Sequence, residues 1–553
     1  MKKIITVLVS ICMILTTMVH DVCADGFDPW NYDFLIYTDE FISAYYNGVW
    51  QQTGYFTDKD LDTIEGIGLD YNNGEYTLNI TRNISFNANK DICSSTFDEF
   101  YNSMIYVLSK KLKIVGEGTL TLVMATDDFD NNSMSKCISL LYGGDLNIES
   151  SNNDNRLILQ MLDESTPAKK IDTTGIHDVK SNISINNAVV IINTSKSGIE
   201  FLNPDNEDQL NINNSDINIS CKENLTNTDY YGITNDGTDS TYISNFINSE
   251  FYFSNPTNKN MYCIKSSDKI YFDGCEVNAD NGTIMNLLTI EGYNRDIEKH
   301  IEIKNSIIEA QCLNECIASY SYGDLFIEDS YIDFTSIGPV IQTINNVNIK
   351  YTSDCSTITK TDDFIFSINT SGADRAIVYE YDDNSSRDRS TNHHVNIDIA
   401  PTLNIFYSEY PYTDDNPLYD DINITQNNVK TITLKDTIEE DSKAAYKYYS
   451  IKKVAGIISF DLDGGTPNYD PIIVENYGDI DLNNYKPTKS GYDFGGWYGI
   501  DPYGTIEYTT PLSEFVEDGI DARRDETFRA KWIKKGGQSS DSGKHIVLDT
   551  GVN

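Results

Sequence analysis

The phrase Leu210-Asn-Ile212-Asn-Asn214-Ser215-Asp-Ile217-Asn-Ile219 decides the fold of this chain. Apolar residues alternate with polar ones on both sides of Asn214, and this period of two predicts two short strands that each bury one face. Asn and Gly tolerate the left-handed backbone conformation that a sharp corner requires. The phrase therefore predicts a strand, a one-residue corner and a second strand.

Copies of this phrase recur from about residue 182 to residue 349. Successive anchors, defined as the second apolar residue of each copy, are 22 to 34 residues apart. They are Ile185, Ile212, Phe246, Phe272, Ile303, Ile327 and Ile349. Weaker copies lie upstream at Ile80, Ile114 and Ile148, with gaps of 34, 34 and 37 residues. The corners carry Asn187, Asn214, Asn248, Gly274, Asn305 and Asp329. Repeats of about 20–50 residues indicate solenoids, propellers or arrays.

We therefore expect an all-β chain built around a right-handed parallel β-helix, a solenoid in which each copy forms part of one coil. The corner Asn side chains of successive coils would stack and hydrogen-bond as a ladder. A leucine-rich repeat has a similar core phrase, but it needs a shorter period and a leucine-bearing helical return that this sequence lacks. A meander of antiparallel strands in one or two sandwiches is the alternative that composition leaves open.

The charge of the chain limits its partners. The 553 residues carry a formal net charge of −44, and the pI is about 4.3. Nucleic acid is not expected as a partner, because phosphate binding needs clustered Lys and Arg. An anionic polysaccharide would also be repelled unless calcium bridged it to the protein. The charge is typical of a protein that stays soluble outside the cell.

The N-terminus predicts export. Lys2 and Lys3 precede an apolar run from Ile4 to Val19, and Val22-Cys23-Ala24 is an A-x-A-like cleavage site. These features indicate a signal peptide over residues 1–24. No other stretch is apolar enough to span a membrane, so we expect the mature chain to be secreted or held at a bacterial cell surface or envelope.

Eight cysteines remain after the signal peptide, from Cys93 to Cys355. Their even number and the predicted export permit disulfides, but the sequence does not predict a pairing. Cys275 occupies the small position after a corner, where other copies have Ser, and this indicates packing. Cys312 and Cys316 have no second Cys pair or His partner nearby, which argues against a zinc site.

From Ala455 the pattern changes. Three motifs follow in order: Ile458-Ser-Phe460-Asp-Leu-Asp-Gly464-Gly465, Lys486-Pro487-Thr-Lys-Ser-Gly491-Tyr492-Asp-Phe494-Gly-Gly496-Trp497-Tyr498 and Thr527-Phe-Arg-Ala530-Lys531-Trp532. Over about 75 residues this stretch resembles the Listeria–Bacteroides repeat, also called the internalin B-repeat. The resemblance implies a small β-grasp-like module of bacterial surface and secreted proteins, without catalytic residues. We expect Trp497 and Trp532 in its core, because a module this small needs large aromatic side chains.

The upstream half resembles, more loosely, bacterial surface proteins in which an imperfect parallel β-helix precedes such a repeat. The phrases that carry this likeness are Leu112-Lys-Ile-Val-Gly116-Glu-Gly118-Thr-Leu120 and Gly144-Asp-Leu146-Asn-Ile148. The expected organisation is a signal peptide (1–24), an N-terminal cap (25–70), the β-helix (71–390), terminal coils with a connector (391–454), the repeat module (455–533) and a flexible tail (534–553).

The sequence predicts no catalytic, cofactor-binding or metal-ligating residue. Asn227-Thr228-Asp229 matches the first motif of polygalacturonases, but the motifs that should follow are missing. His393 and His394 have no Ser, Cys or acidic partners in a recognisable frame. Residues 127–132, Asp-Asp-Phe-Asp-Asn-Asn, offer the oxygen ligands that calcium prefers, but they lack the EF-hand Gly and Glu. A solvated loop is the simpler interpretation, and calcium is the one cofactor left open.

We therefore expect a non-catalytic, adhesin-like protein that binds glycan or cell-envelope polymer through the β-helix. Exposed Tyr residues would favour this binding function. A cluster of Asp, Glu and Arg or Lys on one solenoid face would favour the alternative, a polysaccharide lyase or glycoside hydrolase. An inert polar surface would favour a structural stalk. The aromatic segments at 25–70 and 402–419 are interpreted first as caps, and second as surfaces that stack on sugars.

Overall fold

The computed structural model describes residues 32–535, with gaps at 38–41, 52–58, 88–102, 125–134, 142–143, 153–155, 165–171, 180, 203–208, 224–228, 236–242, 258, 268, 292–300, 321–322, 353–363, 374–375, 380–392, 401–402, 409–428, 435–447, 454–455, 471, 475–480, 502–503 and 509–525. The chain forms two compact units. The first comprises residues 1–400 and 405–451, and the second comprises residues 401–404 and 452–553. The predicted signal peptide lies outside the described residues.

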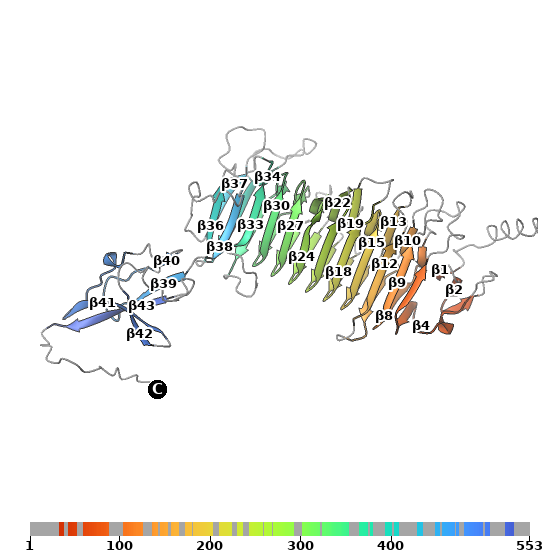
Figure 1. Cartoon of the computed structure of the whole chain (residues 1–553), viewed down its shortest axis with the longest axis horizontal. Helices are drawn as coiled ribbons and strands as arrows, with labels where there is room; N and C mark the ends of the chain where they lie inside the picture. Colours follow the sequence, from red (N-terminus) through yellow and green to blue (C-terminus); the bar gives the residue numbers. More distant parts are fainter. Residues whose placement is uncertain are drawn as a thin grey trace, which may run out of the picture. The chain divides into compact units, whose positions relative to one another are not determined.

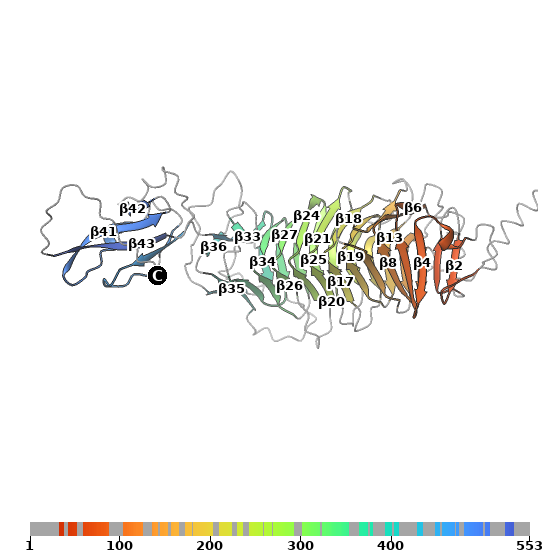
Figure 2. The same ribbon diagram turned by 90° about the horizontal axis from the view of Figure 1, so that it is seen from below.

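The first unit is a parallel β-helix (Figures 1 and 2). Its strands form three long sheets, which we name A, B and C, and each coil contributes one strand to B, then one to C, then one to A. Neighbouring strands of successive coils pair in parallel, as between β14 (Ile183–Asn186) and β17 (Gln209–Asn213). The predicted all-β solenoid is therefore confirmed, and the antiparallel sandwich is excluded for these coils.

The strands have the following bounds. Sheet A contains β1 Phe34–Tyr37, β2 Ile42–Tyr46, β3 Val49–Gln51, β7 Ser103–Leu108, β10 Ser135–Leu141, β13 Thr173–Val179, β16 Ser197–Leu202, β19 Asp229–Asn235, β22 Asn260–Ser266, β25 Ile284–Ile290, β28 Ile317–Ser319, β31 Ile341–Thr343 and β34 Ile377–Tyr379. Sheet B contains β4 Ile67–Asn72, β5 Glu75–Ile80, β8 Lys111–Gly116, β11 Leu146–Ser150, β14, β17, β20 Ile243–Ile247, β23 Lys269–Asp273, β26 Ile301–Lys304, β29 Leu325–Glu328, β32 Val347–Tyr351, β35 His393–Ile399 and β37 Val429–Leu434. Sheet C contains β6 Ile84–Asn87, β9 Thr119–Met124, β12 Ile158–Asp163, β15 Val189–Thr194, β18 Asp216–Cys221, β21 Glu250–Asn255, β24 Glu276–Gly282, β27 Ile307–Cys312, β30 Tyr331–Ser336, β33 Phe364–Thr370, β36 Leu403–Ser408 and β38 Tyr448–Lys453.

The recurring phrase forms the passage from sheet B to sheet C. Every corner position that the phrase predicts has a left-handed backbone, with φ between 45° and 66°: Asn187, Asn214, Asn248, Gly274, Asn305 and Asp329. The corner amides donate to the backbone of the next coil, as from Asn214 N–H to Ile247 O at 3.0 Å. The one-residue corner is thus confirmed, and its polar backbone groups are satisfied.

The anchors lie in register from coil to coil. Ile114 pairs with Ile148, Ile148 with Ile185, and the series continues through every later anchor to Ile349. The first anchor was wrong by two residues, because Leu78, and not Ile80, lies opposite Ile114. Ile80 instead pairs with Gly116. A shift of two keeps the same face inward, so the pattern alone could not distinguish the two registers.

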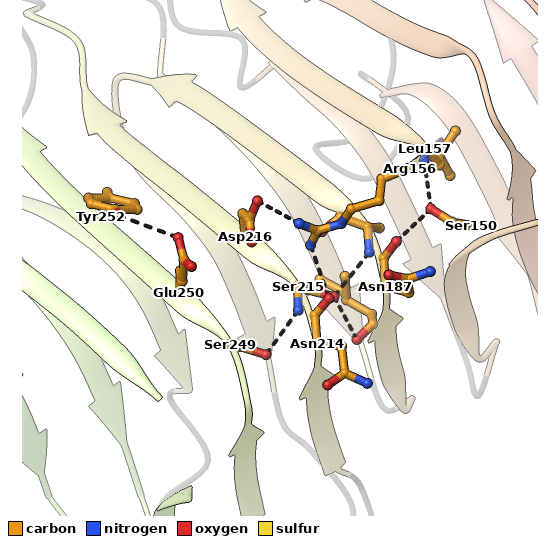
Figure 3. Close-up of polar contacts among 12 residues, drawn as sticks. Ser150, Arg156, Leu157, Asn187, Asn214, Ser215, Asp216, Ser249, Glu250 and Tyr252 are labelled. Atoms are coloured by element: carbon orange, nitrogen blue, oxygen red, sulfur yellow. Dashed lines mark hydrogen bonds and ion pairs between the residues drawn. The ribbon is translucent and has the colours of Figure 1, made fainter. Parts of the chain in front are cut away.

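Two side-chain ladders run along the coils beside the corner position for which a ladder was predicted, one before the corner and one directly after it. The Asn–Asn hydrogen bonds of successive coils lie on the strands of sheet B, as from Asn245 to Asn211 at 2.9 Å. The residue after the corner forms a buried serine ladder inside the coil (Figure 3). The amide of Ser215 donates to Ser249 Oγ at 3.1 Å, and the Ser249 hydroxyl donates to the carbonyl of Ile247 at 2.8 Å. Ser306 and Ser330 repeat this geometry.

Replacing Ser249 with Ala is expected to lower the free energy of unfolding by about 1–3 kcal/mol, because the buried Ser215 amide loses its acceptor. The control is Ser184→Ala, which alters a half-buried hydroxyl on the outer face of sheet B. Urea denaturation followed by circular dichroism measures the free energy of unfolding of both variants. Equal midpoints for the two variants would show that the ladder contributes nothing.

A column of glycines crosses sheet A. A Cβ on Gly175, Gly198 or Gly232 would lie 2.4–2.6 Å from the backbone carbonyl oxygen of the next coil. The same Cβ would crowd the side chains of Ile192, Ile219 and Phe253, which project from sheet C. Glycine at these positions therefore lets the coils approach one another closely.

The N-terminal segment continues two of the sheets beyond the first coil. Strand β1 pairs antiparallel with β7, and β4 pairs antiparallel with β5. These strands cover edges that would otherwise be open to pairing with another chain. The rings of Phe34 and Tyr76 stack at 4.8 Å, and both side chains are buried.

The second unit contains one five-stranded sheet in the order β40-β39-β43-β41-β42. The strands are β39 Gly456–Asp461, β40 Ile472–Val474, β41 Tyr492–Asp501, β42 Gly504–Tyr508 and β43 Glu526–Lys534. Strands β39 and β43 are parallel, whereas β39 pairs antiparallel with β40, and β41 pairs antiparallel with both β42 and β43. Trp497 is 3 % exposed within the core, and Trp532 packs against that core. The prediction that both indoles serve the core is confirmed.

Candidate functional site

The outer face of sheet B carries one row of side chains in register. It consists of Asn147, Ser184, Asn211, Asn245, Tyr271, Glu302, Phe326, Asn348 and Asn396, and we call it the sheet B row. Consecutive members are one strand apart, about 4.8 Å. The Asn396 amide donates to Asn348 at 2.9 Å, so the amides are fixed by one another. The row thus presents a regular series of polar groups and two aromatic rings.

The aromatic rings of the row lie at the surface. Phe326 is 41 % exposed and Tyr271 is half-buried. Glu302 lies between them in register, and Asn245 lies on the other side of Tyr271. An exposed ring flanked by amide and carboxylate groups can stack on the apolar face of a sugar while its neighbours bond the hydroxyls.

The charges around the row are largely compensated. Glu302 pairs with Lys304 at 2.6 Å, and Glu328 pairs with Lys350 at 3.1 Å. Lys269 lies 5.8 Å from the centre of the Tyr271 ring. This local pairing contrasts with the net charge of −44 for the whole chain. The carboxylates beside the two rings are thus paired with lysines rather than left as isolated charges.

The outer face of sheet C carries carboxylates in register instead (Figure 3). Asp216, Glu250 and Glu276 lie on three successive strands. Arg156 bonds Asp216 at 2.6 Å and the carbonyls of Ala188 and Asn214 at 2.8 and 3.0 Å, so it ties three coils together. The Tyr252 hydroxyl donates to Glu250 at 3.4 Å, and the ring is 41 % exposed.

This column of carboxylates beside Arg156 is the kind of acidic and basic cluster that, from the sequence, would favour a polysaccharide lyase or glycoside hydrolase. Neighbouring strands place carboxylates about 5 Å apart, the separation of a retaining pair. A general acid must also stay protonated near neutral pH, which such enzymes achieve by burying it. Glu250 and Glu276 are exposed. The column therefore lacks the environment that a catalytic acid needs.

The outer side of sheet A differs again, because its polar groups are buried. The His177 imidazole Nδ1 lies 2.9 Å from Glu200 Oε2, and Lys196 lies 2.7 Å from the other oxygen of Glu200. Burial lowers the pKa of His177, although the hydrogen bond to Glu200 opposes this. Burial alone would raise the pKa of Glu200, but the bond from His177 and the charge of Lys196 bring it to about 2.

This pair predicts a pH dependence. The unfolded His takes up a proton as the pH falls through about 6.5, while folded His177 resists protonation, so the folded state loses stability below that pH. The free energy of unfolding of the wild type should fall more steeply between about pH 7 and pH 5 than that of His177→Gln. The charged groups that act on His177 are Glu200, Lys136 and Lys196. Urea midpoints at each pH measure this, and parallel curves would contradict it.

The motifs weighed in the sequence do not converge on one site. Asp229 begins β19 and accepts from Asn260 at 2.8 Å, while Asn227 and Thr228 lie outside the described residues, as does the candidate calcium loop at 127–132. The amide of His394 bonds Asn346 at 3.0 Å at the start of β35. Among the described residues, no three His, Cys, Asp or Glu side chains form a group that could hold a metal ion.

The described cysteines are buried free thiols at positions 137, 221, 263, 275, 312 and 316. Cys275 Sγ contacts the carbonyl of Asp273 at 3.6 Å, which is the serine-ladder position. Its predicted packing role agrees with this geometry. Burial raises the pKa of Cys275 to about 11, so its thiol is a poor nucleophile.

Comparison with known proteins found no matching protein-family model, curated protein or solved structure. Within the part of the chain that the structure describes, we find no helix with the length and apolarity needed to cross a membrane.

Proposed function

We propose that this protein binds a neutral glycan or cell-envelope polymer through the sheet B row, as an adhesin-like protein of the bacterial surface or of the secreted fraction. The observation that carries the proposal is the pair of rings, Tyr271 and Phe326, set in register among fixed amides on a face whose charges are paired. Each ring lies two strands, about 10 Å, from the other. A polymer lying across the strands could contact both rings at once.

Sequence features support the surface location. The signal-like N-terminus predicts export, and the resemblance of residues 455–533 to the Listeria–Bacteroides repeat suggests a spacer or adhesion module. Fractionation of the producing cells, with an antibody against the chain, tests this location. Recovery of the protein in the cytoplasmic fraction alone would contradict it.

The binding test uses the full chain in affinity gels that contain soluble neutral polysaccharides, and in pull-downs with insoluble cell-wall polymer. The double variant Tyr271→Ala/Phe326→Ala should bind about tenfold more weakly, because each lost stacking contact is worth about 0.5–1.5 kcal/mol. The control is Ile337→Ala, which removes an apolar side chain that is 53 % exposed but lies outside the row.

Three results would separate the functions. Retention of the wild type and the control, with loss in the double variant, supports the proposal. Release of reducing ends or unsaturated products would instead favour a hydrolase or lyase. A wild type that binds none of the polymers would favour the structural stalk.

A further inference from the structure

Three successive strands of sheet B carry the two rings, and the carboxylate between them, at an even spacing. Tyr271 on β23 lies opposite Glu302 on β26, which in turn lies opposite Phe326 on β29. Neighbouring strands are about 4.8 Å apart, so the two ring-bearing positions are about 10 Å apart. The backbone ladder fixes this spacing, and a ligand that contacts all three side chains must match it.

Contacts on its own strand fix the direction of the Tyr271 side chain. The Tyr271 hydroxyl donates to Asp273 Oδ2 at 3.2 Å, and Lys269 Nζ lies 5.8 Å from the centre of the ring. These two residues are two positions after and two positions before Tyr271, so all three side chains project from one face of β23. The ring is thus positioned before a ligand arrives, which reduces the entropy lost on binding.

The position between the rings offers hydrogen bonds instead of a stacking surface. One carboxylate oxygen of Glu302 lies 2.6 Å from Lys304 Nζ, and the other lies 3.7 Å from Lys269 Nζ. A carboxylate accepts hydrogen bonds and an ammonium group donates them. A sugar above Glu302 would therefore find partners for its hydroxyls, whereas sugars above Tyr271 and Phe326 would find aromatic rings.

We propose that the sheet B row binds an extended, uncharged β-1,4-linked glycan that runs across the strands, with one sugar over each coil. This inference rests on the glycan binding proposed above and names the class of glycan. Sugars of an extended β-1,4-linked chain follow one another at nearly the spacing of strands, and alternate sugars have the same orientation. Tyr271 and Phe326, two strands apart, would thus contact equivalent sugars. Chains with α-1,4 or β-1,3 links curl into helices and do not keep successive sugars over successive strands.

Affinity gels with the full chain test the linkage. The probes are hydroxyethylcellulose and glucomannan, which have β-1,4-linked backbones, and soluble starch and a soluble β-1,3-glucan, which do not. We expect the first two to retard the wild type and the other two to bind about tenfold more weakly or not at all. Failure of both β-1,4-linked probes to retard the protein would overturn the inference. Binding to starch, to the β-1,3-glucan or to insoluble cell-wall polymer would then show that the proposed function itself survives.

A displaced ring tests the spacing while the number of rings stays the same. The double variant Tyr271→Ala/Asn245→Tyr moves one ring to the neighbouring strand β20, so that the rings lie three strands apart. The moved ring would then lie under a sugar of the opposite orientation, and hydroxyethylcellulose should bind no better than it binds Tyr271→Ala.

The matched control for the displaced ring is Tyr271→Phe, which keeps a ring in its place and should bind hydroxyethylcellulose within about twofold of the wild type. Urea midpoints equal to that of the wild type confirm that each variant is folded. Wild-type binding by the displaced variant would show that the spacing does not select the ligand, and would overturn the inference while leaving glycan binding by the rings intact.

Discussion

Replacing Gly198 with Ala is expected to lower the free energy of unfolding of the β-helix by about 3 kcal/mol. The added Cβ would lie 2.4 Å from the carbonyl oxygen of Gly232 and 3.1 Å from a methyl group of Ile219. The first contact is with backbone of the next coil, which is held in the parallel ladder of sheet A. The strain cannot be relieved by a change of rotamer, so the two coils must separate locally.

Gly68→Ala is the matched control. Gly68 also lies within a strand, β4, but the nearest atom to its added Cβ would be Asn79 Cβ at 3.9 Å, an ordinary contact. Chemical denaturation followed by circular dichroism should show a much lower midpoint for Gly198→Ala and a nearly unchanged one for Gly68→Ala. Similar midpoints would mean that the coils of sheet A adjust freely around the glycine column.

The sequence predicted two of the three sheets because these have one face in solvent. In β17, Leu210 and Ile212 are buried while Asn211 between them is half-buried. Apolar and polar residues therefore alternate along the strand, and this alternation can be recognised in the sequence. In β16 of sheet A, five consecutive residues from Ser197 are buried. A strand buried on both faces has no alternation to detect, so the third strand of each coil was hidden in the variable return.

The same reason explains which site residues the sequence missed. Tyr271 and Phe326 lie just before an anchor, at a position where the repeated phrase accepts any residue. A single copy of the phrase therefore gives no sign that this position carries a site residue. Reading this position across successive copies returns Asn211, Asn245, Tyr271, Glu302, Phe326 and Asn348, which is the sheet B row. The correct period and anchor were therefore enough to find the row, once the outward position was compared between coils.

The buried His177–Glu200 pair on sheet A could not be found in this way. The two residues are 23 positions apart in the sequence, and they precede or follow no common motif. Only the register of β13 and β16 places them side by side. That register depends on the lengths of the returns between coils, which vary from copy to copy.

Phe246→Ala is expected to lower the free energy of unfolding by about 3–5 kcal/mol, since it empties a large space in the core. Phe246 is fully buried on β20, and its ring lies 4.9 Å from the rings of both Phe251 and Phe272. Three aromatic side chains from three strands thus fill one layer of the solenoid. The rigid ladders on either side limit how far the coil can collapse into the cavity.

Phe326→Ala is the matched comparison for Phe246→Ala, because it removes another Phe side chain from sheet B, but from the outer face instead of the core. Phe326 is 41 % exposed, so its loss should change stability by no more than about 0.5 kcal/mol. It should nevertheless weaken polymer retention in affinity gels. Urea midpoints and gel mobility measured on both variants test the two faces together. A large loss of stability in Phe326→Ala would show that this ring serves the fold, and would remove the main support for polymer binding on sheet B.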